Sequence, residues 1–206
     1  MASGMGQDAG GIEALEAALA AAEARVQRLE AQLRSLADHD PLTDLRNRHS
    51  MEEAIGDHVV ACHRYGPSGA LLLLAVNGLD DVARITGGDG ADDARVVIAE
   101  ALLRRLRSTD VVARWAADEI AVLLPRAAQG EVNVVALALV DLVEAAGTDR
   151  VRPGTLSASI GAAFLTGDDH PDDLVVRASL AMLAARREGG SRLVVDSRQL
   201  ARASTA

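Results

Sequence analysis

GALLLLAVNG, residues 69–78, is the stretch that decides the fold. Between Gly69 and Gly78, residues 70–76 are apolar without interruption, and Asn77 is the first polar residue after them. A run that is apolar at every position, rather than at alternate positions, indicates a strand covered on both faces of a sheet. We therefore predict the central strand at residues 70–76.

The flanking sequence predicts further strands and helices. Apolar stretches at residues 111–115 and 120–124 are separated by AADE at 116–119, which predicts a hairpin with a short acidic turn. Later strands are predicted at 156–164 and 193–195. Helical spacing of apolar residues predicts helices at 51–63, 91–106, 131–146 and 172–187. This order predicts an α/β domain whose central mixed sheet is flanked by helices.

The first part of the chain carries a heptad pattern. Apolar residues alternate in steps of three and four, at Ile12, Leu15, Leu19, Ala22, Val26, Leu29, Leu33 and Leu36. With Ile12 at position a, Arg25 lies at g and Glu30 at the following e, the pairing expected in a parallel two-stranded coiled coil. We predict a coiled-coil helix at residues 12–37 that forms a homodimer through residues 12–36. The alternative is one amphipathic helix packed on its own domain.

The remaining boundaries follow from these elements. We expect residues 1–11 to be a disordered or cloning-derived N-terminus, residues 38–197 to be the α/β domain, and residues 198–206 to be a C-terminal tail. The chain shows no secretory signal and no apolar run near the ~18 residues of a membrane span, so no membrane contact is expected.

Composition narrows the class of protein. A net charge of -9 disfavours a nucleic-acid partner, because phosphate contacts need clustered basic residues. The single cysteine, Cys62, has no partner for an internal disulfide, which favours a reducing cytoplasm. All 21 basic residues are arginine, a bias typical of GC-rich bacterial genomes.

Five motifs occur in a fixed order along the chain. They are DPLTDLRNR at 40–48, the strand ending at 76, RSTDVVARWAADEIAVLLP at 107–125, SASIGAAF at 157–164, and ASLAMLAARREGGSRLVV at 178–195. In content and spacing they resemble the GGDEF domain of diguanylate cyclases over nearly all of residues 38–196. The resemblance implies a palm-like sheet similar to nucleotide cyclases and polymerases. It also implies that active members bind one GTP with magnesium on each protomer of a dimer and join the two into cyclic di-GMP.

The signature motif of that family is altered here. It falls on residues 116–120, where GGDEF has become AADEI. The resemblance implies that the two glycines let backbone amides approach the triphosphate, which depends on the absence of Cβ and on access to positive φ. Ala116 and Ala117 add methyl groups, and an alanine held at positive φ costs about 1 kcal/mol. Weak GTP binding is expected.

The metal position is altered as well. In the family the central strand ends in Asp-x-Asp, whose first Asp holds magnesium, and this position is Ala75. Magnesium needs oxygen ligands, and alanine has none in its side chain. Asp118 and Glu119 keep the acidic positions of the signature, or they form a solvated acidic turn. We predict a catalytically inactive cyclase with no catalytic residue and no metal site, in which magnesium matters only if residual activity exists.

Other positions of the nucleotide site are partly retained. The guanine-binding Asn has become Ala83, while Asp92 keeps the position that pairs with the guanine edge. Asp92 is equally suited to N-cap a helix that begins at Asp93. The phosphate-contacting Lys corresponds to Arg186, which the helix dipole also favours, and a following Arg has become Gly190. The predicted vestigial nucleotide site is Asp92, Asp118, Glu119 and Arg186.

A second site of the family has its motif in register. Arg107 and Asp110 form RxxD, with Asp110 six residues before Ala116. The resemblance implies an inhibitory site for cyclic di-GMP, in which a guanidinium binds phosphate or guanine and a carboxylate accepts from the guanine edge. Arg104 and Arg105 leave a coincidental match open.

The helix at 131–146 bears on two of the possible functions. It contains no arginine to complete an RxxD site, which predicts weak binding of cyclic di-GMP. It is also apolar on nearly every side at 134–140, so either a protein partner covers it or it is well buried. Three functions stay open: a dimeric cyclic di-GMP receptor in signal transduction, a ligand-independent dimerisation or protein-interaction module, and a residual GTP-dependent cyclase.

Overall fold

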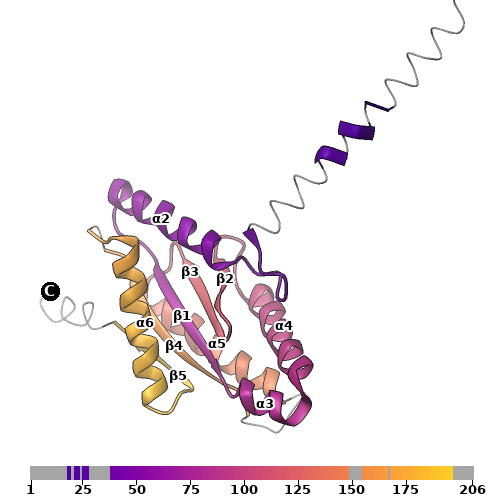
Figure 1. The fold of residues 1–206 in the computed structure, drawn as a ribbon. Coiled ribbons are helices and arrows are strands. Elements are labelled where there is room, and N and C mark those ends of the chain that lie inside the picture. Colours follow the sequence, from indigo (N-terminus) through magenta and orange to yellow (C-terminus); the bar gives the residue numbers. More distant parts are fainter. Residues whose placement is uncertain are drawn as a thin grey trace, which may run out of the picture. The chain divides into compact units, whose positions relative to one another are not determined.

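A five-stranded sheet forms the centre of the computed structural model (Figure 1). The strands are β1 (Ala70–Asn77), β2 (Val111–Ala116), β3 (Glu119–Leu124), β4 (Ser157–Phe164) and β5 (Arg192–Val195). They lie in the order β2-β3-β1-β4-β5, and neighbours are antiparallel except β4 and β5, which are parallel. The predicted mixed sheet with a central first strand is confirmed.

The structure describes residues 18–19, 21–23, 25–27, 38–148, 155–166 and 168–196. The chain forms two units, Met1–Asp38 and His39–Ala206. In the first unit the described residues 18–19, 21–23 and 25–27 are helical, and the predicted seam residues Leu19 and Val26 are 61% and 53% exposed. Five other seam residues, and the segments predicted as N-terminus and tail at 1–11 and 198–206, lie outside the described residues.

Among the described residues of the second unit, five helices cover the sheet (Figure 1). They are α2 (Arg48–Tyr65), α3 (Leu79–Thr86), α4 (Gly88–Arg105), α5 (Gln129–Thr148) and α6 (Pro171–Arg187). Four of them were predicted to within three residues at each end. The short helix α3 was not. It begins after Gly78, whose φ of 92° is left-handed and whose missing Cβ leaves room for the carbonyl of Thr155.

The start of α4 corrects one sequence prediction. This helix begins at Gly88 and has Gly87 as its N-cap, directly after α3 ends. Asp92 therefore lies inside the helix, and the N-cap role considered for it is wrong. A position one turn into the helix points its side chain along the helix surface, where it can meet a residue three positions later.

The core lies in two layers, one on each face of the sheet. On one face, Leu72 and Leu74 of β1 pack with buried residues of α3, α4 and α5. On the other, Leu71 and Leu73 pack with α2 and α6. All four leucines are fully buried, which confirms that β1 is covered on both sides. No helix in the described part of the chain has the length and apolar character needed to cross a membrane.

Candidate functional site

The hairpin that carries the signature positions closes in a tight turn at Ala117 and Asp118, between the paired residues Ala116 and Glu119. Among the described residues, the non-glycine positions with positive φ are Asp44 and Ser191. Ala116 and Ala117 therefore adopt the turn without left-handed strain, and the strain considered for them is absent. What their substitution adds is two exposed methyl groups at the position of the family's glycines.

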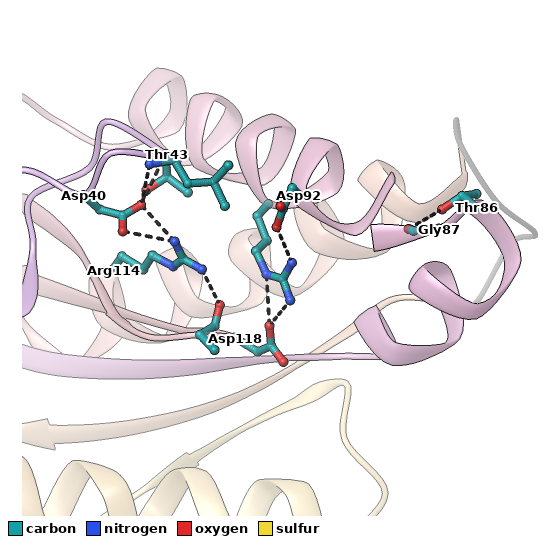
Figure 2. Close-up of polar contacts among 10 residues, drawn as sticks. Asp40, Thr43, Thr86, Gly87, Asp92, Arg114 and Asp118 are labelled. Carbon is teal, nitrogen blue, oxygen red and sulfur yellow. Dashed lines mark hydrogen bonds and ion pairs between the residues drawn. The ribbon is translucent and has the colours of Figure 1, made fainter. Parts of the chain in front are cut away.

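One side of this turn is held by Arg114. Its Nη2 donates to the carbonyl of Ala117 at 3.2 Å, while Nη1 lies 3.0 Å from Asp40 Oδ2 (Figure 2). Asp40 also accepts hydrogen bonds from the backbone and hydroxyl of Thr43, at 2.9 and 2.8 Å. Burial raises the pKa of Asp40, but the bonds from Thr43 and Arg114 outweigh it, so this pKa lies below its ordinary value. Asp40 is thus a charged anchor for the turn.

The other side of the turn is held by Arg95 of α4. Its Nη2 and Nε lie 2.6 and 3.1 Å from Asp118 Oδ1, and its Nη1 lies 2.8 Å from Asp92 Oδ1 (Figure 2). Burial lowers the pKa of Arg95, but the hydrogen bond and charge of Asp118, followed by those of Asp92, raise it above its ordinary value. The structure thus brings Asp92 and Asp118 together, with an arginine between them. Asp118 is not simply a solvated acidic turn residue.

These residues do not fit magnesium. Ala75 faces Glu119 across β1 and β3 and offers no side-chain oxygen. Asp92 and Asp118 are already bonded to a guanidinium, which brings a fixed positive charge to the place where a cation would have to approach. Within the described parts of the chain, no three His, Cys, Asp or Glu residues are grouped so that they could hold a metal ion.

The other two predicted residues of the vestigial site come from β3 and α6. Glu119 is half-buried at the start of β3, in the strand positions that face α2 and α6. Arg186 is exposed in the last turn of α6. Glu119 lines one small cavity together with Arg95 and Asp118, and Arg186 is not part of that lining.

A separate pocket of about 370 Å³ lies where the end of α4, the loop after β3 and the start of α5 meet. Its lining includes Arg105, Arg107, Asp110, Arg126, Glu131 and Val134. The predicted RxxD residues therefore share one pocket. As predicted, α5 contributes no arginine, but Arg105 and Arg126 line the pocket from outside that helix.

Arg107 and Asp110 form a tight turn just before β2. The Asp110 carboxylate accepts the backbone N–H of Arg107 at 2.9 Å, and the N–H of Asp110 donates to the Arg107 carbonyl at 3.0 Å. The side chain of Arg107 is 72% exposed, with Nη2 3.5 Å from Glu131 Oε1. Glu131 Oε2 accepts the backbone N–H of Ala128 at 3.1 Å. That bond, and then Arg107, hold the pKa of Glu131 below its ordinary value.

Sequence reasoning missed Arg95, Arg126 and Glu131. The spacing of Asp92 and Arg95 by three residues was a usable signal, because such pairs are neighbours on a helix. The predicted hairpin was a usable signal for Arg126, because the pairing of Val111 with Leu123 brings the residues after β3 beside those before β2. Glu131 was noted as the start of a helix, not as a partner of Arg107.

The sequence of this chain is similar to those of known proteins. The family model "Diguanylate cyclase, GGDEF domain" matches residues 37–192. The diguanylate cyclase DgcP of Pseudomonas aeruginosa is 34% identical over 161 residues, which cover 76% of this chain and 23% of that protein. The chain thus spans less than a quarter of the length of this relative.

Solved structures agree in fold. The coiled coil and GGDEF domain of DgcB from Caulobacter crescentus, in complex with cyclic di-GMP, superposes with a TM-score of 0.77 at 23% identity, covering 88% of this chain and 98% of that one. A microbial GGDEF domain described in a novel interaction mode with cyclic di-GMP has a TM-score of 0.71 at 29% identity, covering 80% and 99%. The chain belongs to the GGDEF-domain family of the diguanylate cyclases.

Proposed function

We propose that this chain is a catalytically inactive GGDEF domain that acts as a dimeric cyclic di-GMP receptor in the bacterial cytoplasm. The observation that carries the proposal is a contrast between two sites. At the signature turn, Arg95 already bonds the acids Asp92 and Asp118. At the RxxD pocket, the guanidinium of Arg107 is exposed toward a pocket with two further arginines.

The loss of catalysis follows from what phosphoryl transfer needs. That reaction depends on metal ions that bridge phosphates and neutralise developing charge. Ala75 removes one ligand, and Arg95 bonds Asp118, so a cation would have to displace a partly buried ion pair before it could bind. Ala116 and Ala117 place methyl groups where phosphates would approach the backbone.

The pocket suits the product better than it suits the substrate. Its volume falls within the range of roughly 300 to 1,000 Å³ typical of small-molecule sites. Arginine forks bind phosphate oxygens and guanine edges in bidentate fashion, and Asp110 lies in the same lining. The microbial GGDEF domain that is 29% identical to this chain is described in an interaction with cyclic di-GMP, which supports the choice of ligand.

Two experiments on the purified protein test the proposal. Incubation with GTP and magnesium should give no cyclic di-GMP above background, and turnover that Asp118→Ala abolishes would instead establish the residual cyclase. Calorimetric titration with cyclic di-GMP should show a Kd in the micromolar range, about -8 kcal/mol. Absence of binding to the wild-type protein would rule out the receptor.

A pair of variants identifies the site. Arg107→Ala removes the exposed fork, so affinity should fall by about 2 to 3 kcal/mol, the usual scale for a charge-assisted hydrogen bond. Arg104→Ala is the matched control, because Arg104 pairs with Glu100 on α4 and does not line the pocket. Equal losses in the two variants would mean nonspecific attraction of an anion.

A second candidate is a ligand-independent dimerisation and interaction module. The observation that favours it is the outer face of α5, where Val134 and Leu137 are 63% and 56% exposed. The inner face of the helix is buried against the sheet, so the apolar sequence of α5 is only partly explained by the core. A titration without heat, together with a stable dimer, favours this candidate over the receptor.

A further inference from the structure

The RxxD pocket contains a carboxylate, that of Glu131, close to the arginine that would bind a phosphate of the proposed ligand. Glu131 lies in the first turn of α5, and its Oε2 accepts a hydrogen bond from the backbone N–H of Ala128 at 3.1 Å. The same carboxylate directs Oε1 toward Arg107 Nη2 at 3.5 Å. Because the cap bond fixes one oxygen, the other is held near the arginine rather than free to leave it.

Asp110, the acid of the RxxD motif, bonds the backbone of Arg107 and not its guanidinium in the described contacts. Asp110 directs its carboxylate to the backbone N–H of Arg107, which closes the turn. Glu131 is therefore the acid that contacts the guanidinium of Arg107 in the described contacts. A phosphate that binds Arg107 must displace Glu131 or lie beside its negative charge, and like charges at this range repel.

The charges of the pocket lining predict that removing the charge of Glu131 raises the affinity for cyclic di-GMP. Arg105, Arg107 and Arg126 contribute three positive charges to the lining, and Asp110 and Glu131 contribute two negative charges, which leaves one net positive charge. Cyclic di-GMP carries two phosphate charges. Without the charge of Glu131, the lining would carry two net positive charges and would match the ligand.

We propose that Glu131 is an intrachain competitor for the phosphate of cyclic di-GMP at Arg107, and that it sets the affinity of this pocket. The inference rests on the proposed function. It makes Glu131 an affinity-determining residue: the ion pair is weak and exposed, so it is exchanged for the ligand at a modest cost. The pair thereby keeps the receptor empty at low ligand concentration.

The test is Glu131→Gln in the 206-residue chain, titrated with cyclic di-GMP. Glutamine keeps an oxygen that accepts from Ala128, so the cap of α5 is retained while the charge is lost. Affinity should rise by roughly three- to tenfold, the scale of one exposed pair plus relief of repulsion. The control is Glu100→Gln, which removes the same charge from α4 outside the pocket.

A double variant shows whether Glu131 acts through Arg107. In an Arg107→Ala background, Glu131→Gln should give no gain beyond that of Glu100→Gln. Equal gains from both glutamine variants in the wild-type background, or no gain from Glu131→Gln, would overturn the competitor role while the receptor stands. Binding by the Glu131→Gln variant alone would show that Glu131 blocks the ligand, but it would overturn the receptor role of the wild-type chain. Absence of binding by both proteins would overturn the proposed function itself.

Discussion

Arg95 and Arg107 differ in their surroundings, and this difference determines whether each arginine is bonded by acids of the chain or is accessible to a ligand. Arg95 is 20% exposed and bonds two carboxylates at 2.6 to 3.1 Å. Arg107 is 72% exposed and has one acid at 3.5 Å. Short charge-assisted bonds at partly buried positions are stronger than long exposed pairs. Arg107 therefore exchanges its partner easily, whereas Arg95 does not.

The sequence predicted part of this chemistry. The effects of Ala75 and of the two signature alanines could be predicted from the sequence, because at each of these positions the residue type alone determines whether a ligand oxygen is present or a methyl group is added. Arg95 was not, because its contact with Asp118 depends on where α4 begins and how it packs beside the hairpin. The predicted start at 91 was three residues late, so the inner position of Asp92 was missed. Long-range contacts of this kind require tertiary structure.

Asp40 gives a prediction that depends on pH. Asp40→Asn keeps an oxygen for Thr43 but loses the charge that Arg114 pairs with. At pH 7 we expect a loss of about 1 to 2 kcal/mol in the free energy of unfolding, because the side chain is 16% exposed and its bonds are charge-assisted. The pKa of Asp40 is lowered in the folded state, so this contribution is present above the unfolded pKa and is lost as pH falls through the folded pKa.

Urea unfolding of wild type and Asp40→Asn at pH 7 and at about pH 3 checks this sign, since the unfolded pKa is near 4. The difference in unfolding free energy should shrink at the lower pH. Asp57→Asn, at an exposed position of α2, is the control. A difference that stays constant or grows on acidification would show that the charge of Asp40 is not what stabilises the turn.

At the scale of elements, burial on both faces made β1 easy to predict, and short length made α3 hard. The eight residues of α3 contain just over two turns, which is too few for a helical period to stand out. The glycines on either side of α3, Gly78 and Gly87, also predict a loop, so the helix between them was not predicted. The pairing of β5 with β4 likewise depends on where α6 returns the chain.

The packing of α6 on β4 depends on one glycine. A Cβ at Gly161 would collide with the backbone of Ala178 and Met182 in α6. Backbone atoms cannot move aside as a flexible side chain can, so the helix would have to shift away from the sheet. Leu174, Ala178 and Met182 would then lose part of their burial in the second core layer.

Gly161→Ala should therefore lower the free energy of unfolding by about 1 to 3 kcal/mol, the usual range for overpacking a core. Thermal unfolding followed by circular dichroism measures the effect. Gly56→Ala in α2 is the control, because its added Cβ meets no atom within 4 Å apart from its chain neighbours and the nearby backbone of its own helix. That change should be neutral or stabilising by up to about 1 kcal/mol. Equal melting temperatures for the two variants would contradict the close approach of α6.

At the scale of the whole molecule, β2 connects the features that carry the proposed function. It begins directly after Asp110 of the pocket and ends at the signature turn. Its outer edge is bonded by Arg46, whose N–H donates to the Val112 carbonyl at 3.3 Å and whose carbonyl accepts from Arg114 at 2.8 Å. Arg46 belongs to the segment that follows residues 12–36 in the chain. The backbone of β2 is thus bonded to the segment that comes next in the chain after the predicted coiled-coil helix.

The predicted homodimer rests on the heptads, because Leu19 and Val26 are exposed and five other seam residues lie outside the described part. Two exposed apolar a-positions on a helix gain burial from a partner helix. The double variant Leu19→Glu and Val26→Glu places like charges at facing positions, so it should convert the dimer into a monomer in light scattering at micromolar concentration.

Ala20→Glu with Gln27→Glu adds the same charges one residue later in each heptad, at positions b that face outward in a coiled coil. This control should remain dimeric, since its added charges stay in water and neither disturbs the a and d seam. If the seam variant and the control both remain dimeric, the contact lies in residues 39–206 instead. If both become monomeric, added charge alone opposes association. Only a difference between the two variants assigns the dimer to the heptads.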